Sequence, residues 1–183
     1  MLPLEIREAR LRDAAAIAKV HVDTWRSAYR GLLPQAVFDR LDYGRREAQW
    51  RETLASGRDE SCSTWVAVAS GEIVAFASAG PASAPLEDER GEVYAIYVRA
   101  EHQRHGIGVK LFRAVLSDLR GFALEPVVLW VIRGNPACSF YESLGGRQDG
   151  EREQTMAGTQ VPIIAYRWDT EAIDGLIRRQ GRP

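Results

Sequence analysis

The sequence predicts an α/β fold in which one mixed β-sheet is flanked by helices. Strand-length runs of β-branched and aromatic residues alternate with amphipathic helical patterns along the chain. Two pairs of these runs are separated by short turn sequences, as in antiparallel hairpins. The central run, Val93 to Val98, is followed by a glycine loop and then by a helix. No repeat or linker interrupts the 183 residues, so we expect one domain at residues 1–168 and a short helix or frayed tail at residues 169–183.

The expected elements follow one another closely. A first strand spans Leu4 to Arg10, and we expect Asp13 to cap a helix that ends near Ala28. Two shorter helices follow, and the next helix after the glycine loop has one apolar face. The two short helices are expected at Leu32 to Leu41 and Arg45 to Ala55, and a later helix at Asn135 to Gly145 has Pro136 at its first position. The remaining strands are expected at Ser63 to Ala69, Glu72 to Ala79, Glu92 to Val98, Val127 to Ile132, Arg147 to Thr155 and Gln160 to Trp168.

The composition excludes several classes of protein. The 24 Lys and Arg residues balance 25 Asp and Glu residues, so no global field favours nucleic acid or an anionic membrane. The two cysteines do not suggest a disulfide framework, and the three histidines show no ligand spacing, so we expect no bound metal. No signal peptide and no apolar run of membrane-spanning length is evident, which makes the cytoplasm the expected location.

The glycine loop has the features of an anion site. The first N–H groups of a helix lack internal partners, and the helix dipole adds partial positive charge there. Gly106 and Gly108 are expected to let the backbone approach a ligand, and Arg104 and His105 add donors. The Walker pattern is absent because Val109-Lys110-Leu111 follows Gly108, and the three-glycine dinucleotide pattern is absent as well.

Two segments resemble the GNAT superfamily of acetyl-CoA-dependent N-acetyltransferases. One is Gln103-Arg104-His105-Gly106-Ile107-Gly108 after a strand, and the other runs from Asn135 to Gly145 with Phe140-Tyr141-Glu142 inside it. The resemblance covers roughly residues 4–168 and is specific only between Glu92 and Gly145. One departure is Gly145-Gly146, where the family usually has Gly-Phe, which leaves the packing of the next strand in question.

The resemblance implies a site for acetyl-CoA at a splayed pair of central strands. It assigns the pyrophosphate to the backbone of Gln103, Arg104, His105, Gly106, Ile107, Gly108 and Val109. It assigns the acetyl carbonyl to the Ile96 N–H group and the pantetheine arm to Tyr97 and Val98. Asn135 has two roles open to it, as a helix cap and as a pantetheine contact.

Glu92 and Tyr141 are the candidate catalytic residues. Glu92 lies four positions before Ile96, so strict alternation would place both side chains on one face of the strand, and some family members have a catalytic carboxylate at this spacing. Alternatively, Glu92 is a solvated glutamate at the end of a strand. The resemblance makes Tyr141 the acid that protonates the thiolate, whereas its alternative reading is core packing.

The resemblance also places an acceptor site near the first helices. Trp25 and Tyr29 would form a wall of this site, and Trp130 would line the same cavity, although plain core packing remains open for all three. The sequence therefore predicts an acetyl-CoA-dependent N-acetyltransferase acting on a small-molecule or peptide amine. The alternatives are a non-catalytic acetyl-CoA-binding regulatory module and, less favoured, a nucleic-acid-binding domain. No short motif encodes the acceptor or the oligomeric state, so a homodimer stays open.

Overall fold

The computed structural model describes residues 4–56, 61–83, 88 and 90–178, and it contains one seven-stranded sheet. The strands are β1 (Glu5–Glu8), β2 (Ser63–Ala69), β3 (Glu72–Pro81), β4 (Gly91–Val98), β5 (Val127–Ile132), β6 (Arg147–Met156) and β7 (Thr159–Trp168). Their order in the sheet is β1-β2-β3-β4-β5-β7-β6, and all neighbours are antiparallel except the parallel pair β4 and β5. The predicted mixed, mostly antiparallel sheet is confirmed.

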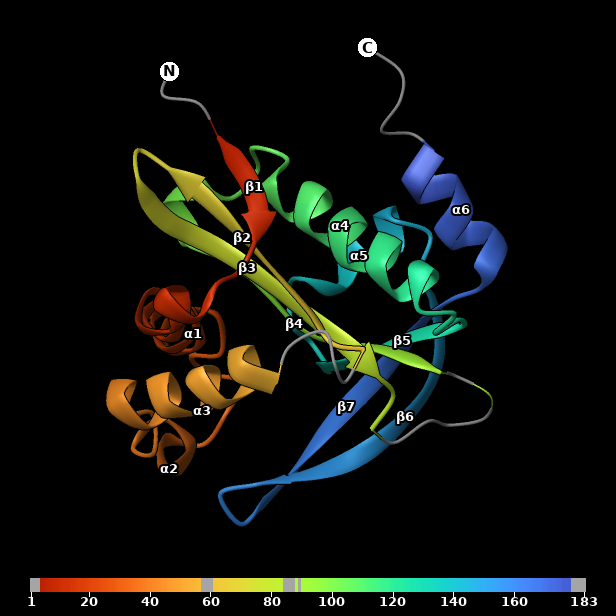
Figure 1. The fold of residues 1–183 in the computed structure, drawn as a ribbon. Coiled ribbons are helices and arrows are strands. Elements are labelled where there is room, and N and C mark those ends of the chain that lie inside the picture. Colours follow the sequence, from red (N-terminus) through yellow and green to blue (C-terminus); the bar gives the residue numbers. More distant parts are fainter. Residues whose placement is uncertain (1–3, 57–60, 84–87, 89, 179–183) are drawn as a thin grey trace.

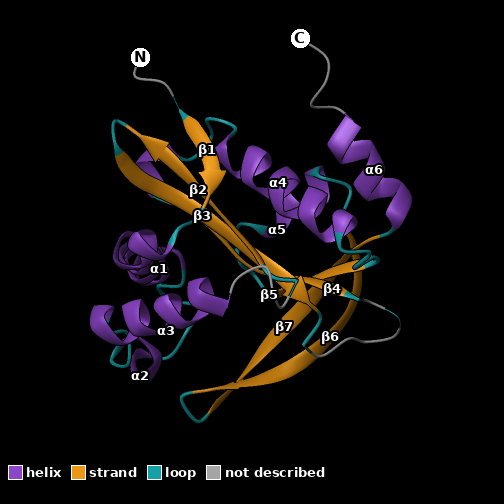
Figure 2. Cartoon of the chain, viewed as in Figure 1, coloured by secondary structure: helices purple, strands orange, loops and turns teal. Residues whose placement is uncertain are grey.

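Helices cover both faces of this sheet (Figures 1 and 2). They are α1 (Ala14–Ala28), α2 (Gln35–Phe38), α3 (Tyr43–Ser56), α4 (Ile107–Gly121), α5 (Cys138–Ser143) and α6 (Thr170–Arg178), with short 3-10 turns η1 (Leu11–Asp13) and η3 (Ala100–His102). The helices α1 and α3 pack on β2 and β3 from one side, around the buried Ile17, Trp50 and Phe76. The helix α4 covers the opposite side, where its apolar stripe is fully buried.

Residues Thr170–Arg178 form the helix α6, and residues 179–183 of the expected helix or tail lie outside the described residues. Ile173 and Leu176 of α6 are buried in the same core cluster as the apolar face of α4. Both tight hairpins have the turn residues that their geometry needs. Ser70 and Gly71 join β2 to β3, and Ala157 and Gly158 join β6 to β7, in each case with two positive φ angles.

Several predicted element ends are wrong by a few residues. Asp13 precedes α1 but does not cap it, because its carboxylate accepts hydrogen bonds from the Arg7 guanidinium (2.7 and 3.0 Å) and from the Arg10 N–H group (2.7 Å). The helix expected from Leu32 to Leu41 is reduced to α2, since Pro34 has an extended backbone. The helix expected from Asn135 begins only at Cys138.

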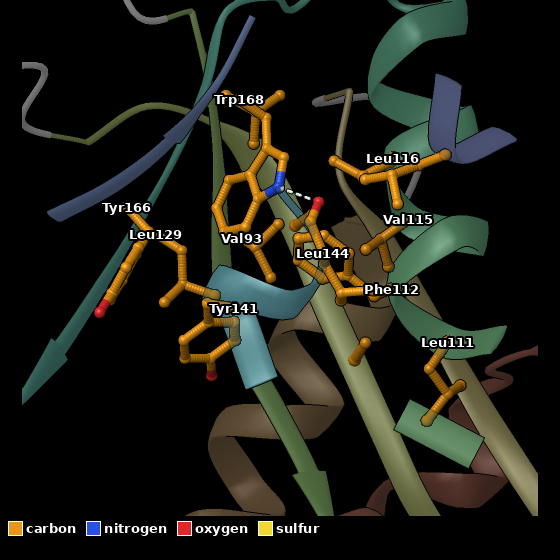
Figure 3. Close-up of a cluster of buried hydrophobic side chains, with 14 of the residues drawn as sticks. Val93, Leu111, Phe112, Val115, Leu116, Leu129, Tyr141, Leu144, Tyr166 and Trp168 are labelled. Atoms are coloured by element: carbon orange, nitrogen blue, oxygen red, sulfur yellow. Dashed lines mark hydrogen bonds between the residues drawn. The ribbon is translucent and has the colours of Figure 1, made fainter. Parts of the chain in front are cut away.

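The Trp168 side chain explains how the chain packs around Gly146. The indole of Trp168 comes from β7, is completely buried and donates a hydrogen bond to the Leu144 carbonyl oxygen (3.0 Å; Figure 3). A Cβ atom on Gly146 would lie 2.5 Å from Cζ2 of this indole. Glycine is therefore needed at position 146, because the Trp168 indole occupies the space that a side chain there would fill.

Candidate active site

The central strands β4 and β5 diverge where the resemblance predicts a cosubstrate. Their parallel pairing is confined to Gly91 with Val127 and Glu92 with Val128, so the following residues of β4 lack a partner in β5. A cavity of about 30 Å³ opens along this divergence. Its lining includes five residues predicted for three different roles, namely Tyr29, Ile96, Tyr97, Trp130 and Tyr141. Helix α1, two strands and α5 thus contribute to one site.

The glycine loop lies between β4 and α4 and ends in a left-handed turn. Arg104 and Gly106 have φ angles of 64° and 75°. The side-chain Nε2 atom of Gln103 donates a hydrogen bond to the Val98 carbonyl oxygen (3.0 Å). Arg104 and His105 are exposed, whereas the Ile107 side chain is buried in the core. The side chain of Ile107 therefore anchors the helix, and its end presents backbone N–H groups to solvent.

The two glycines of this loop have different roles. A Cβ atom on Gly106 would meet nothing within 4 Å, so the positive φ angle and the open space above it are what favour glycine there. A Cβ atom on Gly108 would lie 3.2 Å from Cζ of Phe140 in α5. Gly108 therefore also allows α4 to pack against Phe140, a role that the sequence did not predict. Val109, one residue further on, is partly buried beside the same cluster.

A β-bulge in β4 changes the predicted orientation of Glu92. Ser78 of β3 pairs with Ala95, but the next residue, Ala79, pairs with Val93, so Tyr94 is an extra residue in β4. Val93 and Ile96 consequently both pack in the core beneath α4, although strict alternation would separate them. Glu92 adjoins Val93 and lies on the opposite face, so the expectation that Glu92 and Ile96 share a face is wrong.

The bulge places Glu92 on the face that α1 and α3 cover. Ala95 and Tyr97 pack into the cluster beneath α1 and α3, and Glu92 lies on that same side of β4. Glu92 is 9% exposed, and its Oε2 atom accepts hydrogen bonds from the Ser83 N–H (2.9 Å) and hydroxyl (2.7 Å) groups. Glu92 is not a freely solvated strand-end residue, because two donors hold its carboxylate.

Tyr94 was missed in the sequence and lies close to Glu92. Its side chain is 43% exposed, and its hydroxyl group donates a hydrogen bond to the Pro81 carbonyl oxygen (2.5 Å). Burial of the hydroxyl end and the nearby Cys62 and Glu92 raise the pKa of Tyr94, so it stays a neutral donor. The bulge at Tyr94 adds Ala95 and Tyr97 to the face that α1 and α3 cover, and a bulge leaves no signal in the composition of a single strand.

A hydrogen-bonded group of aromatic residues joins α1 to the central strand. The Tyr97 hydroxyl accepts a hydrogen bond from Trp25 Nε1 (2.9 Å) and lies 3.3 Å from the Tyr29 hydroxyl. Burial raises the pKa of Tyr29, and its hydrogen bonds with Tyr97 and Asn135 oppose that shift. The side chains predicted as an acceptor wall therefore contact a residue that lines the cavity between the strands.

Tyr141 is held in the core with its ring beside this cavity. Its ring makes edge or tilted contacts with Phe140, Tyr166 and Trp168, and Figure 3 shows it projecting from α5 below Leu129. Burial, reinforced by the neighbouring Tyr29 and Cys138, raises the pKa of the Tyr141 phenol. The phenol therefore keeps its proton at neutral pH, as a proton donor must.

Asn135 acts as the cap of a turn. Its Oδ1 atom accepts a hydrogen bond from the Ala137 N–H group (2.8 Å), and the residue is buried. Its side chain also hydrogen-bonds to Tyr29, which lines the cavity between β4 and β5, so capping and contact with the site are both open to it. His21 is neutral, because burial and then the charge of Arg46 lower its pKa to about 3, and its Nδ1 atom accepts a hydrogen bond from Trp50 Nε1 (3.3 Å).

Within residues 4–56, 61–83, 88 and 90–178, no group of three or more His, Cys, Asp or Glu side chains could hold a metal ion. None of the helices in that part of the chain is both long and apolar enough to cross a membrane.

Comparisons with known proteins agree with this geometry. A model of the Acetyltransferase (GNAT) family matches residues 21–146. The uncharacterized N-acetyltransferase YuaI of Bacillus subtilis is 32% identical over 179 residues, which is 95% of this chain and 98% of the relative.

Solved structures show the same fold. The PaiA N-acetyltransferase of Thermoplasma acidophilum, in complex with coenzyme A, superposes with a TM-score of 0.68 at 19% identity, covering 91% of this chain and 100% of that one. The yncA protein of Salmonella typhimurium, solved with its cofactor acetyl-CoA, has a TM-score of 0.67 at 22% identity, with coverage of 91% and 94%. With the diverging strands, the glycine loop and the family match in agreement, the chain belongs to the GNAT family of acetyltransferases.

Proposed function

We propose that this protein transfers the acetyl group of acetyl-CoA directly to a primary amine while both substrates are bound. The observation that carries the proposal is the divergence of β4 from β5, which leaves a cavity between the two strands, with the glycine loop and the N-terminal end of α4 following β4 in the chain. The loop fits the pyrophosphate of acetyl-CoA, because the space above Gly106 is open. At the cavity, the buried Trp130 Nε1 atom has no hydrogen-bond partner among the described residues, so it can donate to the acceptor.

In the proposed reaction the amine nitrogen attacks the thioester carbon and the carbon–sulfur bond breaks. The proton that the amine loses passes to Glu92, directly or through water, and the departing thiolate takes a proton from Tyr141. Glu92 suits this role because it lies on the α1 and α3 side, apart from the α4 side on which the Ile96 side chain packs. A Lys-like amine with a pKa near 10.4 costs about 4 to 5 kcal/mol to deprotonate at pH 7, so a base matters for alkylamines.

The pyrophosphate contact is tested with Gly106→Val, because a β-branched side chain would fill the open space above the loop. The matched control is Gly71→Val in the β2–β3 turn, which has a similar φ angle of 82° and also nothing within 4 Å of an added Cβ. We expect calorimetric titration with acetyl-CoA to show a large loss of affinity in Gly106→Val alone. Undiminished affinity would place the phosphates elsewhere.

Turnover is tested separately by thiol release with a panel of small amines and peptides. Release that depends on the amine supports direct transfer. Tight binding of acetyl-CoA without release for any amine would favour the alternative of a non-catalytic acetyl-CoA-binding module.

A further inference from the structure

Arg46 in α3 is a half-buried cation without an acidic partner. Three other half-buried arginines have acidic partners, Arg7 with Asp13 (2.7 Å), Arg99 with Glu72 (3.5 Å) and Arg167 with Asp88 (2.8 Å), whereas Arg113 in α4 shares the unpaired state of Arg46 among the described residues but lies on the opposite face of the sheet. No hydrogen bond or ion pair of the Arg46 side chain is found in the part of the chain that the structure describes. A partly desolvated guanidinium without a counter-charge is costly unless a ligand supplies one.

The position of Arg46 on α3 directs it toward the proposed acceptor side. Trp50 lies one helical turn later on the same face of α3, is buried, and donates its indole N–H group to His21 of α1. The His21 ring in turn lies 5.1 Å from the ring of Tyr97. Arg46 interacts electrostatically with both His21 and Tyr97, so its charge lies near the aromatic residues between α1 and β4.

The two ring neighbours of Arg46, His21 and Tyr97, offer no negative charge. Burial and the charge of Arg46 lower the pKa of His21 to about 3, so the imidazole is neutral. Burial, followed by the proximity of Tyr29, raises the pKa of Tyr97, so that phenol is neutral as well. The Tyr97 hydroxyl is already bonded to Trp25. The positive charge of Arg46 is thus left uncompensated beside a residue that lines the cavity.

We propose that Arg46 binds a carboxylate of the acceptor, and that the acceptor is an amino acid or a close analogue carrying amine and carboxylate on one small molecule. The inference rests on the proposed acetyl transfer and specifies its substrate class. A guanidinium can hold a carboxylate through two parallel hydrogen bonds, which would fix the orientation of a small acceptor. Trp25 and Tyr29 would contact the remainder of that molecule from α1.

The test compares each standard amino acid with its carboxamide, which keeps the amine and removes only the negative charge. Thiol release from acetyl-CoA is measured for the wild-type protein, for Arg46→Met, and for Arg45→Met as the matched control on the exposed side of the same helix. We expect at least one acid to be preferred over its amide by about tenfold or more. Arg46→Met should lower kcat/KM for that acid by about 30-fold to 10²-fold, the low end for loss of a hydrogen-bonded charge partner. Arg46→Met should leave kcat/KM for the corresponding amide, and the affinity for acetyl-CoA, unchanged.

Two results would overturn the inference. One is equal use of acids and amides by the wild-type protein, and the other is an equal loss for both in Arg46→Met. If no amine is acetylated, the proposed function fails. Calorimetric titration of the acids and amides in the presence of CoA then still tests whether Arg46 binds a carboxylate. Binding of an acid but not of its amide, abolished in Arg46→Met and kept in Arg45→Met, supports the carboxylate site, whereas equal binding refutes it.

Discussion

Replacing Glu92 by Gln would remove the proposed proton acceptor while keeping the local structure. The Oε2 atom of Glu92 accepts two hydrogen bonds, from the N–H and hydroxyl groups of Ser83. Glutamine retains an amide oxygen that can accept both, so the start of β4 should stay folded. Any change in rate then reports the lost proton acceptor rather than a displaced strand.

The size of the effect follows from the proton that the amine must lose. For an alkylamine with a pKa near 10.4, only about one molecule in 10³ to 10⁴ is unprotonated at pH 7. A general base typically contributes about 10²-fold to 10⁴-fold, and we expect a loss of kcat/KM in this range at pH 7. Each unit of pH supplies about ten times more free amine, so the penalty should shrink about tenfold per unit as pH rises toward the amine pKa.

The assay is kcat/KM for thiol release between pH 6.5 and 9.5, measured for Glu92→Gln and the wild-type protein with one alkylamine. Ser83→Ala serves as the companion variant, because it removes one donor to Glu92 and keeps the carboxylate. It should cost much less than Glu92→Gln at pH 7. A penalty that stays constant across the pH range, or none at all, would refute the role of Glu92 in proton removal.

Three further outcomes test other side chains. Tyr141→Phe should lower kcat/KM by about 10²-fold, the low end for a general acid, because burial makes this phenol a weaker acid. The affinity for acetyl-CoA should not change. Near-normal turnover would leave Tyr141 with a packing role alone. Trp130→Phe removes an indole N–H that is buried without a partner among the described residues but keeps an aromatic ring beneath Arg152, so Tm should fall only slightly while the acceptor KM rises; an unchanged KM would contradict a ligand contact. Trp168→Ala should lower the free energy of unfolding by about 3 to 5 kcal/mol in urea denaturation, because the indole is fully buried; a loss below about 1 kcal/mol would show that the space at Gly146 collapses.

Much of the fold was predictable because its signals are local. The Ser70-Gly71 pair predicts a hairpin turn, since both positions need positive φ angles, and the structure has them. The strand Val127–Ile132 was predicted with both ends correct, because Pro126 precedes it and its residues are β-branched or apolar. The ends of α2 and α5 were not, since each depends on how a proline-containing turn packs on the rest of the chain.

The site was less predictable, because its geometry depends on pairing and docking. The extra residue at Tyr94 is defined by the register of β4 against β3, and β4 read alone gives no sign of it. Arg46 stands between Arg45 and Glu47, which reads as a solvated helix surface. Only the docking of α3 on α1 makes Arg46 half-buried and leaves Arg45 exposed.

The bulge also separates two kinds of recognition in the proposed mechanism. The side chains of Val93 and Ile96 pack under α4, and the open edge of β4 leaves unpaired backbone groups available to the donor. On the other face, Glu92 and Tyr97 lie toward α1 and α3, and Arg46 of α3 lies near Tyr97. Backbone groups do not change when a side chain is substituted. Substitutions on the α1 and α3 face should therefore alter the choice of amine and leave the use of acetyl-CoA intact, which is why the acceptor cannot be read from the motifs that identify the donor.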